Sequence, residues 1–146
     1  MLLKKSVIFS ALVIAMSGSI SAYAGSKLTT FNKTKEFSTV RLDSGKCAAS
    51  GIFGKHTKPL DSSIVSDIEV RLICGNASGQ GTCGATIIMS PTVEDVKVCK
   101  GKEIGRAVMN VANLNVTLDA NVNPDYVVTA VNSDNGAELT IAPKKN

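Results

Sequence analysis

His56 is the only histidine in the chain, and histidine is the side chain that most often serves as a general base in catalysis. A Ser-His-Asp hydrolase would use it as the base between a serine such as Ser50 and a carboxylate such as Asp43 or Asp61. No G-x-S-x-G nucleophile elbow is present, and the lysines around the histidine disfavour the imidazolium that such a base forms. A small hydrolase using His56 is therefore an alternative function, and the sequence predicts no catalytic residues.

Two further patterns resemble ligand loops but lack parts that such loops require. Residues 79–84 match G-x-G-x-x-G, yet a strand and not a helix is expected to follow, so they fit a hairpin tip better than a dinucleotide site. Side chains with oxygen atoms occupy every second position of residues 119–125, as in a calcium loop, but Pro124 occupies the position of its glycine. The sequence therefore predicts no metal and no cofactor.

The first 24 residues have the organisation of an export signal. Lys4 and Lys5 precede an apolar run over residues 7–16, and Ala22-Tyr23-Ala24 forms an A-x-A cleavage site. The apolar run is shorter than the about 20 residues that span a bilayer. We predict cleavage before Gly25, no transmembrane segment after cleavage, and a secreted or periplasmic protein with residues 25–146 as a single domain.

Four cysteines lie in the exported part, and an even number in such a chain predicts disulfides. The C-x-x-C spacing does not occur in the sequence, so neither a thioredoxin-like redox site nor a zinc site is indicated. The four residues are Cys47, Cys74, Cys83 and Cys99.

The pairing of the cysteines can be argued from a hairpin. If residues 68–74 and 83–90 form antiparallel strands, Cys74 faces Cys83 and the apolar residues of both strands share one face. Facing residues in such strands are about 5.5 Å apart, as a disulfide requires. We therefore prefer Cys74–Cys83, which leaves Cys47–Cys99 as the second bridge, although four cysteines allow three pairings.

The mature chain reads as β structure, because runs rich in Val, Ile and Thr alternate with Gly, Asn, Asp and Pro. Residues 25–36 are weakly patterned and are expected to form a loose N-terminal segment or an edge strand. Asn135-Gly136 predicts a tight hairpin. We predict an all-β fold, a small disulfide-stapled antiparallel sandwich or barrel of about seven or eight strands. The candidate strands are 39–42, 68–74, 83–90, 93–99, 104–111, 114–122, 126–132 and 137–142.

The charge distribution is uneven along the chain. Residues 27–58 carry seven basic side chains against two acidic ones, whereas residues 59–146 carry seven against ten. Such asymmetry is typical of a surface that meets an anionic partner, although a solvated segment would look the same. The candidate binding patch consists of Lys33, Lys35, Lys55 and Lys58.

Together these patterns favour an exported, non-enzymatic protein that binds a macromolecule or cell surface. Protein or an anionic surface is the expected partner. A specific nucleic acid is not, because the chain has no Trp and few other aromatic residues for stacking. The alternatives are the hydrolase using His56 and a structural envelope component, and the sequence does not specify the oligomeric state.

Overall fold

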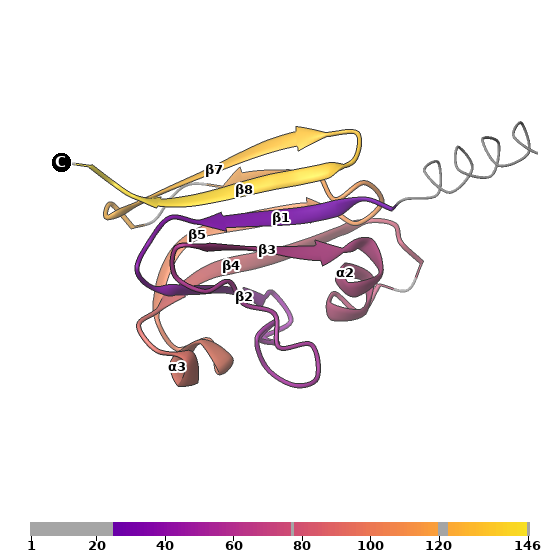
Figure 1. Cartoon of the computed structure of the whole chain (residues 1–146). Helices are drawn as coiled ribbons and strands as arrows, with labels where there is room; N and C mark the ends of the chain where they lie inside the picture. Colours follow the sequence, from indigo (N-terminus) through magenta and orange to yellow (C-terminus); the bar gives the residue numbers. More distant parts are fainter. Residues whose placement is uncertain (1–24, 77, 120–122, 146) are drawn as a thin grey trace, which may run out of the picture.

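The computed structural model describes residues 25–76, 78–119 and 123–145. Two four-stranded sheets form a β-sandwich, with strand orders β3-β1-β8-β7 and β2-β4-β5-β6 (Figure 1). We call them sheet A and sheet B. The strands of sheet A are β1 (Lys27–Asn32), β3 (Asp61–Ser66), β7 (Tyr126–Ser133) and β8 (Gly136–Pro143). Those of sheet B are β2 (Phe37–Leu42), β4 (Thr82–Ser90), β5 (Lys102–Asn110) and β6 (Val116–Asp119). The fold confirms the predicted all-β sandwich, except that β1 and β8 pair in parallel.

Alternation along the strands builds the core between the sheets. In β8, Ala137, Leu139 and Ile141 are buried while Glu138 is exposed. Since successive strand residues face opposite sides, one face of β8 packs against sheet B and the other meets solvent. Asn135-Gly136 forms the predicted tight turn before this strand, where Ser133 pairs with Gly136.

Two predicted strands are wrong, because short helices occupy their places. Residues 68–74 belong to α2 (Asp67–Ile73), which begins with a capping box between Ser66 and Glu69. Residues 93–99 contain α3 (Val93–Lys97), capped by Thr92. In both segments a side chain that satisfies the first helical amides stabilises the helix over the strand.

The N-terminal segment is also more ordered than predicted. Residues 27–32 form β1, which lies between β3 and β8 inside sheet A and is therefore neither a loose arm nor an edge strand. The export signal over residues 1–24 lies outside the described residues, as do residues 120–122 of the predicted strand 114–122. In the parts of the chain that are described, no helix reaches the length and apolarity needed to cross a membrane.

Two disulfides cross-link the fold, one over a long and one over a short stretch of sequence. Cys47 is bonded to Cys99 and Cys74 to Cys83, with Cα–Cα distances of 5.7 and 6.0 Å. This is the pairing that we prefer from the sequence, but the hairpin from which it is inferred is not present. Cys74 is the C-terminal cap of α2 and Cys83 lies in β4, whose partner β5 places Met109 opposite it. The bridge therefore anchors a helix end to sheet B.

Candidate functional site

Three of the four lysines in the predicted patch lie together at one end of the sandwich. Lys33 and Lys35 are exposed in the turn between β1 and β2, and Lys58 is exposed in the segment beside that turn. The buried amide of Asn32 joins the two segments, because its Nδ2 atom donates to the carbonyls of Glu36 at 2.7 Å and of Lys58 at 3.2 Å. The position of these lysines therefore rests on a buried polar side chain that cannot move without losing its hydrogen bonds.

Lys55, the fourth predicted lysine, has a different environment. Its ammonium forms an ion pair with Glu69 of α2. The hydrogen bond from Lys55 lowers the pKa of Glu69, and the hydrogen bonds from Ser66 lower it further, so the carboxylate stays ionised. Lys55 thus connects its loop to α2.

Lysines from later in the sequence reach the end that holds Lys33. Because β8 runs parallel to β1, the amide of Lys33 donates to the carbonyl of Ile141 at 2.8 Å, and the residues after β8 emerge beside the β1–β2 turn (Figure 1). Lys100, in the connection from α3 to β5, is also exposed at this end. We call this cluster the basic end; it consists of Lys33, Lys35, Lys58, Lys100, Lys144 and Lys145.

Few of the nearby carboxylates neutralise the basic end. Glu36 accepts a hydrogen bond from the hydroxyl of Tyr126, and Lys102 approaches it to 3.9 Å. Burial raises the pKa of Tyr126, so the hydroxyl remains a donor. Asp61 and Asp125 are exposed at this end, and α3 beside it adds two acidic side chains and one lysine. Among the described residues, no ion pair involves a lysine of the basic end, so a positive excess remains.

The residues of the alternative hydrolase site do not come together. The Nδ1 atom of His56 lies 3.1 Å from the carbonyl oxygen of Gly54. Ser50 donates to a backbone carbonyl at 2.8 Å, Asp43 pairs with an arginine of β5, and Asp61 accepts from the next amide. None of these contacts joins the histidine to the serine or to either carboxylate.

The two motifs that only resemble ligand loops each overlap the end of a strand. Residues 79–84 run from the α2–β4 connection into β4, so a strand begins there as expected, but they are not a hairpin tip because a helix precedes them. Of the calcium-like residues, Asn121 lies outside the described residues, while the Asn123 side chain accepts from the amide of Asp125 at 2.9 Å. The Asn123 side chain therefore stabilises the turn before β7.

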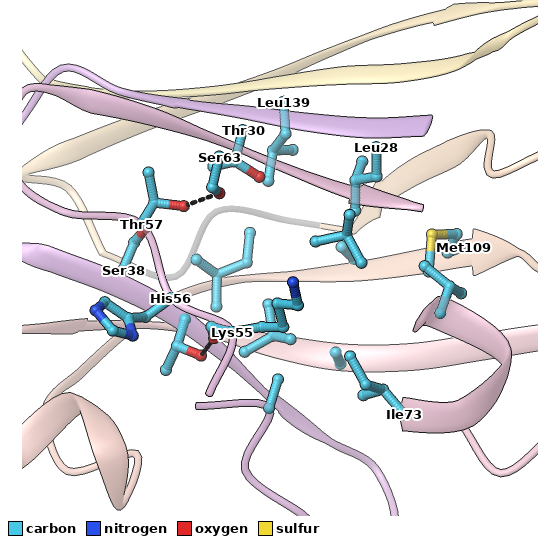
Figure 2. Close-up of a pocket in the computed structure, with 18 of the residues that line it drawn as sticks. Leu28, Thr30, Ser38, Lys55, His56, Thr57, Ser63, Ile73, Met109 and Leu139 are labelled. Carbon is cyan, nitrogen blue, oxygen red and sulfur yellow. Dashed lines mark hydrogen bonds between the residues drawn. The ribbon is translucent and has the colours of Figure 1, made fainter. Parts of the chain in front are cut away.

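A cavity of about 300 Å³ between the sheets is the feature that the sequence does not predict. Sheet A contributes Leu28, Thr30 and Leu139 to its wall, and Ile73 of α2 and Met109 of β5 lie at the other side (Figure 2). Its wall includes residues of two buried apolar clusters, among them Ile87 and Leu139 of one and Leu42 and Ile73 of the other. The gap therefore lies between the sheets and opens in part to solvent.

Small side chains explain why the gap exists. Thr30, Ser38, Ser63, Ala85 and Ala107 line the cavity from five different strands. Where several facing strands all present small residues, no large side chain fills the layer between them. The gap cannot be predicted from any one strand, because each of these residues is common in β structure and only their meeting in the fold leaves space.

These features define a β-sandwich protein that is stapled by two disulfides and carries a basic end and an apolar cavity between its sheets. A family model described as "T2SS substrate NttC" matches residues 2–143. The chain therefore belongs to the NttC family of type II secretion system substrates, and it is a secreted protein.

A solved structure supports the same relationship. The chain is similar to the crystal structure of the Legionella pneumophila type II secretion system substrate NttC, with a TM-score of 0.59 and 25% sequence identity. The match covers 83% of this chain and 100% of that chain. A search of curated proteins finds no match.

Proposed function

We propose that this secreted protein is a non-enzymatic binding protein that attaches to an anionic cell surface through its basic end. The observation that carries the proposal is the convergence of six exposed lysines from four separate chain segments. These segments are the β1–β2 turn, the segment before β3, the α3–β5 connection and the residues after β8.

Fold stability does not require this arrangement. Exposed lysines contribute little to the free energy of unfolding, even when they are paired. Positive charges gathered at one end repel each other at short range and add their fields at longer range, which attracts an anionic partner. A binding role therefore explains the cluster better than a structural one.

The expected strength follows from the number of lysines. Each lysine near an anionic membrane surface contributes about 1 kcal/mol to binding, and the contribution falls off within a Debye length of about 8 Å at physiological salt. Replacing two lysines by glutamate removes this attraction and adds repulsion, so affinity should fall by at least about 30-fold.

The test compares two charge reversals of equal size. The first variant carries Lys33→Glu and Lys58→Glu in the basic end. The control carries Lys27→Glu and Lys46→Glu, two exposed lysines at the other end of the strands. Co-sedimentation with vesicles of phosphatidylglycerol and phosphatidylcholine measures binding, and thermal unfolding checks that both variants fold like the wild type.

The proposal expects strong loss in the first variant, little loss in the control, and weaker wild-type binding as salt rises. Equal losses in both variants would show that total charge, and not the basic end, determines binding. Salt-insensitive binding would move the interaction to another surface.

A further inference from the structure

The inter-sheet cavity is a site separate from the basic end, because no lysine of that cluster lines it. Most of its wall is apolar and belongs to the core: Leu42, Ile73, Ile87, Val116 and Ile141 are each at most 7% exposed. A space with such walls is unfavourable for water, which needs two to four polar partners. Its occupant should therefore be an apolar group.

Several polar groups of the cavity wall lie together on the side that includes Lys55. The hydroxyls of Thr57 and Ser63 lie 2.5 Å apart, and Thr39 donates to the carbonyl of Lys55 at 2.8 Å. Figure 2 shows the Lys55 side chain extended along the cavity, while the ring of His56 points the other way. Lys55 is the charged residue in the wall, and its ion pair with Glu69 is partly exposed, so the polar side is also the mouth.

An apolar chamber with one cation at its mouth matches the chemistry of an amphiphile. We propose that the cavity binds the single aliphatic chain of an anionic amphiphile, with the negative head group paired to Lys55 in exchange for Glu69. At about 30 Å³ per heavy atom, the volume that a water molecule occupies in the liquid, the cavity holds about ten heavy atoms. A chain of about ten carbons fills it.

The first test is a chain-length series measured by isothermal titration calorimetry with hexanoate, octanoate, decanoate and dodecanoate. Burial of each methylene group should strengthen binding about fourfold until the cavity is full, after which the gain should stop near decanoate. A series without chain-length dependence would overturn the proposal, as would the absence of binding by all four.

Variants that fill the cavity locate the site. Thr30→Leu in β1 and Ala107→Leu in β5 place larger side chains into it from opposite sheets, so one remains informative if the other fails to fold. Thr29→Leu is the matched control, because it makes the same substitution at the preceding residue of β1, whose side chain lies on the opposite face of the sheet. Decanoate binding should fall at least about tenfold in each filled variant and stay unchanged in the control. Unchanged binding in a folded filled variant would refute the site.

The head group is tested separately. Lys55→Met should weaken decanoate about tenfold and leave decanol unaffected, since only the carboxylate forms a charged hydrogen bond. Glu69→Gln should strengthen decanoate, because the competing carboxylate is gone. Equal behaviour of decanoate and decanol in all variants would remove the anionic head from the proposal.

One further arm distinguishes the two sources of such a ligand. Decanoate represents a free fatty acid, and a decanoyl lysophosphatidylglycerol represents a lysophospholipid with the same chain and a phosphate head. The tighter ligand of the two identifies the source. Failure of both to bind would contradict the proposal, while the basic-end variant with Lys33→Glu and Lys58→Glu should bind decanoate normally.

Discussion

The two disulfides should contribute unequally to stability, and the difference can be calculated from the loops that they close. Cys47–Cys99 spans 52 residues of sequence and Cys74–Cys83 spans 9. In the chain-entropy model a bridge stabilises the fold by restricting the unfolded chain, and the gain increases with the logarithm of the loop length. The expected contributions are about 4 kcal/mol for the long loop and about 2.5 kcal/mol for the short one.

Burial acts in the same direction as loop length. Cys99 is 7% exposed, whereas Cys74 and Cys83 are both only half-buried. Replacing a buried cysteine by alanine leaves a small cavity in addition to the lost cross-link. The difference of about 1.5 kcal/mol that follows from loop length is therefore a lower bound on the difference in stabilisation between the two bridges.

Urea denaturation of two double variants measures the difference. One carries Cys47→Ala and Cys99→Ala, the other Cys74→Ala and Cys83→Ala, so each keeps the bridge that the other lacks. With an m-value of about 1.5 kcal/mol/M, the first variant should unfold at a urea concentration about 1 M lower than the second. Equal midpoints, or a lower midpoint for the second variant, would refute the loop-length reasoning and indicate that the anchor of α2 matters more.

The folded pKa of Glu69 is lowered, so its ion pair stabilises the fold above the ordinary pKa of 4.5 and loses that contribution as pH falls through the folded value. Glu69→Gln should therefore lower the unfolding temperature at neutral pH and flatten its decline in acid, and an unchanged acid profile would contradict this. Gly136→Ala should cost at least about 2 kcal/mol in chemical denaturation, because φ is +127° and the added Cβ would lie 1.8 Å from the carbonyl oxygen of Lys27. Gly45→Ala has positive φ but open space, so a similar loss there would assign the effect to φ alone. Intact-mass analysis of the secreted protein should find a chain that begins at Gly25, and retention of the first 24 residues would disprove the predicted export signal.

Strands in the second half of the chain are predictable because their local pattern is sufficient. In β8, the alternation of Leu139 and Ile141 with polar residues, after an Asn135-Gly136 turn, defines both the strand and its inward face. The same alternation misleads at α2, where Ile68, Val70 and Leu72 resemble a half-buried strand. In the helix Val70 is buried, while Ile68 and Leu72 are 64% and 55% exposed.

A local signal for α2 exists in the sequence. Ser66 and Glu69 have the S-x-x-E spacing of a capping box, which satisfies helical amides at the start of a short helix. Recognising it would correct the strand prediction for residues 68–74. It would also remove the hairpin from which the Cys74–Cys83 bridge is inferred, although that bridge is present.

The basic end and the cavity depend on contacts that no local pattern encodes. Lys144 lies at the end that holds Lys33 only because β8 is parallel to β1, and parallel pairing has no signature in either strand. The cavity arises from Thr30, Ser38 and Ala107, each of them ordinary in its own strand. The sequence therefore predicts the charge asymmetry but not which lysines share a surface.

The parallel pairing of β1 and β8 also determines when the protein can finish folding. Within the described chain these are the first and the last strands, and they occupy the middle of sheet A, with the β3–β1 and β8–β7 pairs on either side. Each half of sheet A has an unpaired inner edge until residues at opposite ends of the domain meet. Closing so long a loop is slow, and open strand edges are prone to aggregation. Sheet A can therefore become continuous only once the last strand of the described chain is available to pair with the first.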